Sequence, residues 1–377
     1  MHIEIETLAI LRMHLDAGHG WQNVVVQGLD LSSETALLLR GPVEGAVFLG
    51  CAFEPAALAH VHATGGIVFP RLPGVPWDPA RATLYTVDEL MKGTVDGDER
   101  SFFTASADAK IYEHYQRTRA HPPILEALAQ RLHDHAIDDA VGDLLADIEK
   151  QGRGVVAFMG GHALARTEPS WADVARCARA LARAGYFIIT GGGPGAMEAA
   201  NFGAFLAPCK DAELEDAIVH LREAPSYKSP GWIATADAIR KRAPRHGPSL
   251  GVPTWFYGHE PTNLFCTHVA KYFSNALRED GLLAVARHGV VFAPGGPGTI
   301  QEVFMDACQN HYGTFGDVSP MVFLGTKYWR EDKPVYPLLE QLAKGAQYHA
   351  LLGVFDDPDD VVAFLRAHPP LAYVKKS

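Results

Sequence analysis

The sequence predicts an α/β protein whose main domain is a Rossmann-like, doubly wound parallel sheet, preceded by a smaller α/β domain. Three observations support this fold class. From residue 154 onward, short apolar runs alternate with helical patterns, an order typical of parallel sheets with right-handed crossovers. Two of these runs end in a glycine-rich turn that opens a helix. The 377 residues are also enough for two domains of ordinary size.

The first 150 residues indicate the smaller domain. Its core is a β-α-β passage, with strands expected at 24–26, 46–49 and 66–69 and a helix at 55–63. Helical patterns fill residues 108–150 and are interrupted at 121–123, and residues 137–150 resemble a connecting helix. We therefore place the boundary near residue 152, with domains 1–150 and 151–377. Our hypothesis is that the first domain binds an effector nucleotide or builds the oligomer.

The second domain is expected to alternate strands and helices along its length. Strands are predicted at 155–159, 186–190, 250–253, 290–293 and 321–324, and helices at 171–184, 197–207, 265–286, 335–343 and 361–368. The polar segment 208–247 predicts a loop-and-helix excursion. The aromatic segment 254–263 is suited either to stacking on a ring or to filling a domain interface.

Composition excludes several classes of protein. A net charge of -11 argues against a general nucleic-acid binder. No apolar run reaches membrane-spanning length and no signal peptide is evident, so we expect a cytoplasmic protein without membrane association. The five cysteines include no Cys-x-x-Cys pair, which favours free thiols. The 18 histidines fall at no recognised zinc spacing, so no metal is expected.

The glycine turn after residues 290–293 is a candidate anion site. Gly295, Gly296 and Gly298 carry no Cβ, so the backbone can approach a phosphate closely. A helix that starts there presents unpaired N–H groups and a partial positive charge. Thr299 can cap the helix or donate its hydroxyl to the anion. A capping box between Thr299 and Glu302 is the alternative, and it needs no ligand.

The second glycine turn, at 191–195, formally fits a dinucleotide-binding fingerprint through Gly191, Gly193 and Ala196. However, no acidic residue ends the next strand, where a ribose hydroxyl would be bound. Glu198 lies inside the helix start, too early for that role. Neither glycine turn is followed by a Walker A lysine, which argues against a nucleoside-triphosphate hydrolase.

The two glycine turns together indicate a ligand site more strongly than either turn alone. Ligands of open α/β sheets bind outside the carboxyl ends of the strands, where both turns lie. Each turn is followed by an early acid, Glu198 or Glu302. A phosphate at the helix N-terminus with a carboxylate one turn later suits a phosphorylated sugar whose hydroxyls or anomeric carbon face the acid.

The motifs at 191–199 (GGGPGAMEA) and 294–302 (PGGPGTIQE) resemble the paired motifs of the Lonely-guy (LOG) phosphoribohydrolases, a family long mislabelled as lysine decarboxylases. The Gly-Gly-His at 160–162 is similar to that of the larger bacterial nucleotide 5′-monophosphate nucleosidases. The resemblance covers about residues 154–345. It implies hydrolysis of a nucleoside 5′-monophosphate to free base and ribose 5-phosphate, without a cofactor, by a homodimer or higher homo-oligomer.

The resemblance also implies roles for individual residues. Glu302 would bind ribose hydroxyls and activate water, and the turn at 295–299 would hold the 5′-phosphate. Arg278 is the candidate catalytic arginine, although Glu279 occupies the expected position; a helix-surface ion pair is the alternative for Arg278. Further substrate-binding candidates come from the other two motifs: Gly161, His162, Gly192, Gly193 and Glu198.

Two other functions remain open at the level of sequence. The first is a non-catalytic nucleotide-binding or sensing protein that keeps the phosphate site without turnover. The second is a dinucleotide-dependent oxidoreductase, which is weaker because the ribose-binding acid is missing.

Overall fold

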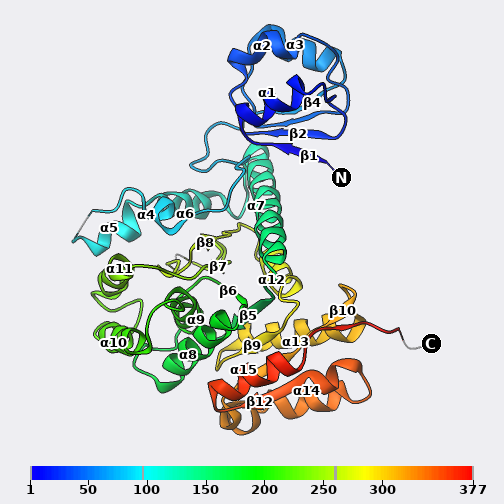
Figure 1. Ribbon diagram of the computed structural model, residues 1–377. Coiled ribbons are helices and arrows are strands. Elements are labelled where there is room, and N and C mark those ends of the chain that lie inside the picture. The colour runs from blue at the N-terminus through cyan, green and yellow to red at the C-terminus, as the bar shows by residue number, and fades with distance from the viewer. Residues whose placement is uncertain (1, 96, 259–260, 376–377) are drawn as a thin grey trace. The chain divides into compact units, whose positions relative to one another are not determined.

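The computed structural model describes residues 2–95, 97–258 and 261–375 (Figure 1). The chain forms two compact units. One comprises Met1–Leu84 with Glu113–Val141, and the other comprises Tyr85–Tyr112 with Gly142–Ser377. Part of the aromatic segment expected at 254–263 lies outside the described residues, at 259 and 260.

The first unit contains a four-stranded parallel sheet in the order β1-β2-β3-β4. Its strands and the helices between them are β1 (Ile3–Ile5), α1 (Leu8–Asp16), β2 (Val24–Gln27), α2 (Thr35–Leu38), β3 (Val47–Leu49), α3 (Pro55–Ala63) and β4 (Ile67–Phe69). Apolar side chains of these elements, among them Val26, Phe48 and Val61, form the core. The β-α-β passage predicted from the sequence is confirmed as part of this larger sheet.

The division of the chain into units differs from the single boundary expected near residue 152. The segment Tyr85–Tyr112, which holds α4 (Val87–Met91), α5 (Glu99–Thr104) and the start of α6 (Ala107–Thr118), belongs to the second unit. Its Asp108 is buried and accepts hydrogen bonds from Trp255 Nε1 at 2.8 Å and Lys271 Nζ at 2.9 Å. These partners are far away in the sequence, so no local pattern indicates the contact. The helix α7 (Ile124–Lys150) contributes residues to both units.

The second unit is built on a seven-stranded parallel sheet in the order β12-β11-β9-β5-β6-β7-β8. The strands are β5 (Val155–Met159), β6 (Phe187–Thr190), β7 (Ser249–Gly251), β8 (His268–Val269), β9 (Val290–Phe292), β11 (Met321–Leu324) and β12 (Leu352–Phe355). The chain winds outward from β5 in one direction and from β9 in the other. The predicted doubly wound, Rossmann-like sheet is therefore confirmed, with its switch point between β5 and β9.

Helices flank this sheet (Figure 1). They are α8 (Pro169–Arg183), α9 (Ala196–Phe205), α10 (Asp211–Leu221), α11 (Trp232–Arg242), α12 (Asn275–Ala284), α13 (Pro297–Tyr312), α14 (Val335–Ala343) and α15 (Pro358–Ala367). A short antiparallel pair joins β10 (Asp317–Val318) to β13 (Leu371–Ala372). Short helical turns lie at Ser32–Glu34 in the first unit and at Tyr328–Asp332 and Gln347–Leu351 in the second.

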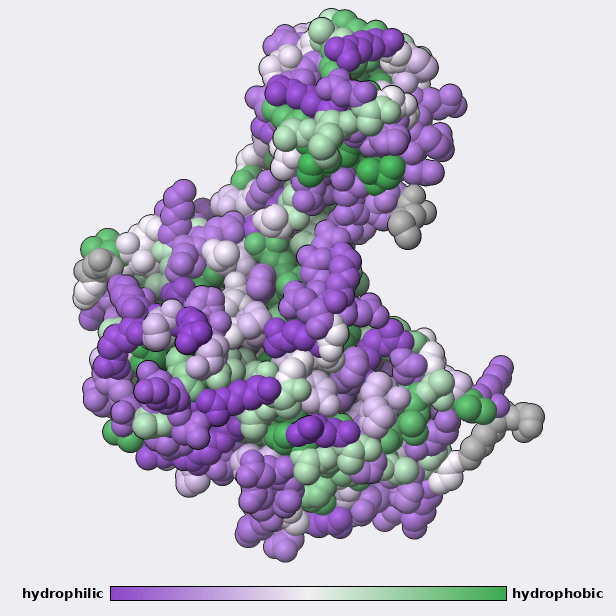
Figure 2. Space-filling view, in the orientation of Figure 1, coloured by the Kyte–Doolittle hydropathy of each residue, from purple (hydrophilic) through white to green (hydrophobic). Residues whose placement is uncertain are grey.

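Burial explains why the central strands are so apolar. All five residues of β5 are buried, as expected for a parallel strand covered on both faces. Hydrophilic side chains dominate the face of the molecule seen in Figure 2, with apolar residues in smaller patches. None of the helices in the described part of the chain combines the length and the apolarity that a bilayer crossing requires.

The helix predicted over 265–286 is wrong in its first half. Residues 268 and 269 form β8, and α12 begins only at Asn275. The reason is tertiary pairing: Ala270 N–H donates to Gly251 O at 2.8 Å, and the Thr267 hydroxyl donates to Ser249 O at 2.8 Å. These bonds with β7 outweigh the local helical pattern.

Candidate functional site

The switch point brings two loops together at the carboxyl ends of adjacent strands. Met159 at the end of β5 pairs with Phe292 at the end of β9. Beyond the strands, Gly161 N–H donates to Pro294 O at 3.0 Å. The sequence-predicted Gly161 is thus in direct contact with the predicted phosphate turn. This is the crevice at which doubly wound sheets bind ligands.

The turn at 294–299 leads directly into α13. Gly296 is the N-cap and Pro297 the first helical residue, and within the described chain no side chain caps this helix end. A Cβ on Gly295 would collide with the Thr299 side chain and lie 2.9 Å from Gly161 N. Glycine is therefore required at 295 for the close approach of the two loops. Gly298 lies in the first turn, where helix N–H groups lack intrahelical partners.

The Thr299–Glu302 capping box, considered as the alternative, is wrong. Because α13 starts at Pro297, Thr299 lies inside the helix and is buried. Its position is not that of an N-cap, so its hydroxyl cannot serve as the helix cap. The N-terminus of α13 therefore retains the geometry of an anion site.

Tyr328 contacts this turn and was missed by the sequence analysis. Its hydroxyl donates to Gly295 O and accepts from Gly295 N–H at 3.2 Å. Tyr328 begins the helical turn Tyr328–Asp332, which follows β11. No sequence pattern links the two positions, which are 33 residues apart.

Glu302 and Arg278 lie side by side next to this turn. Arg278 Nη1 is 3.7 Å from Glu302 Oε1, and 13% of the Glu302 side chain is exposed. A backbone contact also holds the Arg278 side chain in place, because its Nε donates to Val252 O at 2.8 Å. A Cβ on Gly191 would collide with its guanidinium, so the second glycine turn also makes room for the arginine.

The pKa of Glu302 is raised to about 7. Burial is the main cause, because it disfavours the charged carboxylate. The positive charge of Arg278 opposes the rise, and the nearby Glu279 adds to it. The result is a carboxyl group that changes charge near neutral pH.

Glu279 lies in a polar network beside the Arg278–Glu302 pair. It accepts hydrogen bonds from Gln301 Nε2 at 3.0 Å and from the Tyr257 hydroxyl at 3.4 Å. Asn275 Nδ2 donates to the same hydroxyl at 2.9 Å. Glu279 is the residue at the position where the family resemblance placed an arginine. The structure shows that Arg278, one place earlier, reaches Glu302 instead.

The second glycine turn is held in its conformation by hydrogen bonds within the protein. Gly192 has a positive φ of 72°, and both Gly192 and Gly193 are buried. Their carbonyls accept hydrogen bonds from Asn263, at 2.9 Å from its backbone N–H and 3.0 Å from its side-chain amide. These two glycines thus fix the shape of the turn, and their carbonyls are already engaged within the protein.

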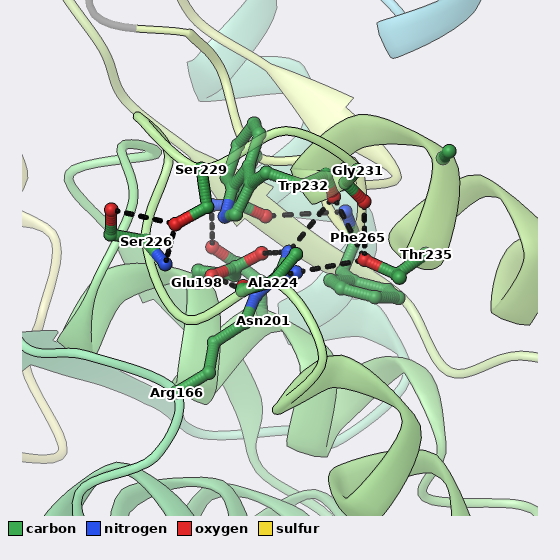
Figure 3. A network of polar contacts seen from close by, with 12 residues as sticks. Arg166, Glu198, Asn201, Ala224, Ser226, Ser229, Gly231, Trp232, Thr235 and Phe265 are labelled. Atoms are coloured by element: carbon green, nitrogen blue, oxygen red, sulfur yellow. Dashed lines mark hydrogen bonds and ion pairs between the residues drawn. The ribbon is translucent and has the colours of Figure 1, made fainter. Parts of the chain in front are cut away.

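Glu198 differs sharply from Glu302, although the sequence motifs pair them. It is 1% exposed, and both of its carboxylate oxygens are bound by the guanidinium of Arg166 (Figure 3). Arg166 was missed because it lies 32 residues earlier, in an irregular loop. The carboxylate of Glu198 is therefore already paired within the protein.

Most of the predicted residues fall into two groups, while Gly192 and Gly193 in the second turn belong to neither. Gly161 contacts the turn that opens α13, and Glu302 on the same helix lies beside Arg278. His162 and Glu198 line a different cavity of about 220 Å³ next to the second turn, with Gly195, Tyr227 and Trp232.

Potential metal ligands converge elsewhere. In the first unit, His2, Glu4 and Asp139 bring ligand atoms within 4.8 Å of one another. The three side chains are exposed or partly exposed, and surface carboxylates commonly gather in this way without an ion. We assign no metal to them.

The comparison with known proteins finds solved structures that resemble this chain at low sequence identity and low TM-score. No protein-family model and no curated protein matches the sequence. Solved structures that resemble the chain include the molybdenum cofactor binding protein from Rippkaea orientalis (14% identity, TM-score 0.37), the molybdenum cofactor carrier protein from Chlamydomonas reinhardtii (17%, 0.36) and the structural-genomics target TM1055 (14%, 0.36). Each of these matches covers 57% of this chain. The match covers 96% of the Rippkaea orientalis chain and 99% of each of the other two chains. At these TM-scores the resemblance carries no argument about function.

Proposed function

We propose that the protein hydrolyses the N-glycosidic bond of nucleoside 5′-monophosphates, releasing the free base and ribose 5-phosphate. The observation that carries this proposal is Glu302. Its pKa is raised to about 7, it lies 3.7 Å from Arg278, and it projects from α13 little more than one turn after a glycine-rich N-terminus.

The 5′-phosphate binds at the start of α13 in this proposal. The backbone N–H groups of Gly296, Gly298 and Thr299 lie at the N-terminus of α13, where the helix dipole favours an anion. Gly161 brings the neighbouring loop to the same point. The net charge of the protein does not oppose this, because the site uses local dipoles and not an excess of Lys and Arg.

Glu302 acts on water and on the ribose. A general base is most effective when its pKa is close to the working pH, and Glu302 meets this condition. It takes a proton from water as the water oxygen bonds to the anomeric carbon and the carbon–nitrogen bond breaks. The electron pair of that bond leaves with the base, which takes a proton from solvent water, while Glu302 returns its proton to solvent, so that no net charge is left on the enzyme. The carboxylate also stabilises the oxocarbenium character of the transition state.

Arg278 supports the charged form of Glu302 in this mechanism. Its guanidinium lowers the pKa of the carboxyl group against the effect of burial. Arg278 is itself positioned by Val252 O. We therefore propose Arg278 as the catalytic arginine of the site.

The test is release of free base from single nucleotides. AMP, GMP, CMP, UMP and IMP are each incubated with the wild-type protein, with Glu302→Gln and with the exposed control Glu331→Gln. We expect base release by wild type and control and its loss in Glu302→Gln. Absence of base with all five nucleotides would refute the proposal.

A non-catalytic nucleotide-binding protein is the second candidate. One observation favours it: the Tyr328 hydroxyl occupies both backbone polar groups of Gly295, so a phosphate must bind to the remaining N–H groups or displace it. Saturable nucleotide binding without base release, strengthened by Tyr328→Phe, would support this function over hydrolysis.

We also propose that the chain forms a homodimer or higher homo-oligomer and that the first unit contributes to assembly or to effector binding. Its four-stranded parallel sheet is a separate α/β core. Analytical ultracentrifugation of the full chain, with and without nucleotide, tests both statements. A monomer that no nucleotide changes would contradict them.

A further inference from the structure

The aromatic segment that begins at Thr254 divides into a buried residue and an exposed pair. Trp255 is fully buried, whereas Phe256 is 38% and Tyr257 is 63% exposed. The rings of Phe256 and Tyr257 pack edge to face, with their centroids 5.2 Å apart. The exposed pair therefore offers an aromatic surface that the steps of the proposed hydrolysis leave unused.

The Tyr257 side chain is oriented in the opposite way to most surface tyrosines. Such side chains usually lay their apolar body on the protein and keep the polar tip in water. Here the hydroxyl accepts a hydrogen bond from Asn275 Nδ2 at 2.9 Å and donates to Glu279 Oε1 at 3.4 Å. Both Asn275 and Glu279 are buried. The hydroxyl is thus held inward, and the ring is left exposed to solvent.

The backbone that carries this ring is also fixed. Trp255 N–H donates to Tyr272 O at 3.0 Å, and Thr254 Oγ1 accepts from Phe256 N–H at 3.0 Å. The ring of Tyr257 is therefore held at both its hydroxyl and its backbone. A surface that is fixed before binding loses less conformational freedom when a ligand arrives.

The hydroxyl of Tyr257 belongs to the polar network beside the catalytic pair. Glu279 follows Arg278 in α12 and accepts from Gln301 Nε2 at 3.0 Å, and Gln301 precedes Glu302 in α13. Burial raises the pKa of the Tyr257 hydroxyl, and Glu279 adds to the rise while Arg278 opposes it. The charge of Arg278 also lowers the pKa of Glu302. The Tyr257 hydroxyl and the Glu302 carboxyl group thus lie near the same guanidinium.

We propose that the base of the bound nucleotide stacks on Tyr257, an inference that rests on the proposed function. The base is attached to the anomeric carbon on which Glu302 acts, so the surface that binds it must adjoin Glu302. The network through Glu279 and Gln301 places the exposed ring of Tyr257 next to that position. Aromatic side chains suit this role, because every nucleobase presents a π-face on which a ring can stack.

The test is isothermal titration calorimetry with two ligands that differ in the base. One is the carbocyclic analogue of AMP, in which a methylene group replaces the ring oxygen of the ribose. It cannot form an oxocarbenium ion, so it stays intact on the protein. The other is ribose 5-phosphate, which has no base. We expect the wild-type protein to bind the analogue about tenfold more tightly than ribose 5-phosphate.

Three variants of the full chain show whether Tyr257 supplies this difference. Tyr257→Ala removes the ring, and Tyr257→Phe keeps it. Tyr312→Ala is the matched control, because Tyr312 is 67% exposed and lies at the opposite end of α13 from the phosphate turn. We expect Tyr257→Ala to weaken binding of the analogue about tenfold, the size of one base–aromatic contact, and to leave the affinity for ribose 5-phosphate unchanged. Tyr257→Phe should bind the analogue more tightly than Tyr257→Ala.

The outcomes separate base stacking from hydrolysis. Equal weakening of both ligands by Tyr257→Ala would show that the ring supports the shape of the site and would overturn base stacking. An affinity for the analogue that is the same in Tyr257→Ala and Tyr312→Ala would also overturn it. Selective loss of the analogue in Tyr257→Ala, from a protein that leaves AMP intact, would support base stacking and refute hydrolysis. A wild-type protein that binds neither ligand would overturn both.

Discussion

At the scale of single residues, two acids with similar sequence contexts have different chemistry. Glu198 and Glu302 each follow a glycine turn early in a helix. Glu198 is bound on both oxygens by Arg166, whereas Glu302 is 3.7 Å from Arg278 and titrates near neutral pH. The difference arises because the Arg166 guanidinium, 32 residues away in the sequence, binds the Glu198 carboxylate. A sequence motif therefore places an acid at the start of a helix without fixing which side chain it pairs with.

The raised pKa of Glu302 predicts how hydrolysis depends on pH. Only the ionised carboxylate accepts a proton from water, so kcat/KM is expected to rise with pH and to level off above about 7. Arg278→Met removes the cation that lowers this pKa and should shift the profile to higher pH. The measurement is kcat/KM for the best nucleotide across the neutral range. A profile that stays flat through pH 7 would contradict the assignment of Glu302.

The same pKa predicts a stability effect of Glu302→Gln. The folded-state pKa of about 7 lies above the ordinary value of 4.5, so the folded wild type binds the proton more tightly than the unfolded chain. The contribution of Glu302 to wild-type stability is therefore fully present below pH 4.5 and is lost as pH rises through 7.

Gln avoids this loss because it carries no charge. Thermal unfolding should show a higher Tm for Glu302→Gln than for wild type above pH 7, by up to about 3 kcal/mol in the free energy of unfolding. The difference should shrink toward acidic pH. A variant that is less stable than wild type at alkaline pH would show that the charged carboxylate is stabilised by its surroundings.

At the scale of elements, the glycine turns are the parts that local sequence predicted best. The strands β5, β6 and β9 appear in the sequence as short apolar runs, and each leads into a turn, because strands buried on both faces require apolar residues throughout. The sequence predicts helix where the edge strand β8 lies, since the two residues of β8 are specified by pairing with β7 and not by their own pattern. Tyr328 and Arg166 were missed for the same reason: their partners are distant in the sequence.

Two neighbouring glycines of the phosphate turn make a matched test of its packing. A Cβ on Gly295 would collide with Thr299, whereas a Cβ on Gly296 would meet no described atom within 4 Å. Gly295→Ala should lower the free energy of unfolding by about 1–3 kcal/mol and reduce base release. Gly296→Ala should retain nearly wild-type stability in urea unfolding. Equal effects of the two changes would show that the turn is not held by the approach of Gly295 to Gly161.

At the scale of the whole molecule, the two units interleave along the chain. The segment Tyr85–Tyr112 lies between two parts of the first unit in sequence but packs with the second. The sequence predicts a boundary near residue 152 because residues 137–150 resemble a connecting helix and the strand–helix pattern of the second domain begins at residue 154. What it could not show is the buried pairing of Asp108 with Lys271, whose members are 163 residues apart.

This arrangement predicts that a chain cut at the apparent boundary is unstable. A fragment of residues 151–377 lacks Asp108, so Lys271 loses its carboxylate partner and Trp255 loses an acceptor in a buried position. An unpaired buried charge costs about 3–5 kcal/mol. Circular dichroism should show that the fragment is unfolded or melts well below the full chain. In the full chain, Asp108→Asn keeps an acceptor for Trp255 and should be less damaging than Asp108→Ala.

In the proposed mechanism Glu302 acts as the base in nucleotide hydrolysis, and a joint measurement of both products tests this role. Free base and ribose 5-phosphate are quantified together, over time, from the same nucleotide with wild-type protein and with Glu302→Gln. We predict equal amounts of the two products from wild type and a loss of at least about 100-fold in the variant, the size expected for a general base. Undiminished release by Glu302→Gln, or a wild-type protein that binds the nucleotide and leaves it intact, would contradict the claim.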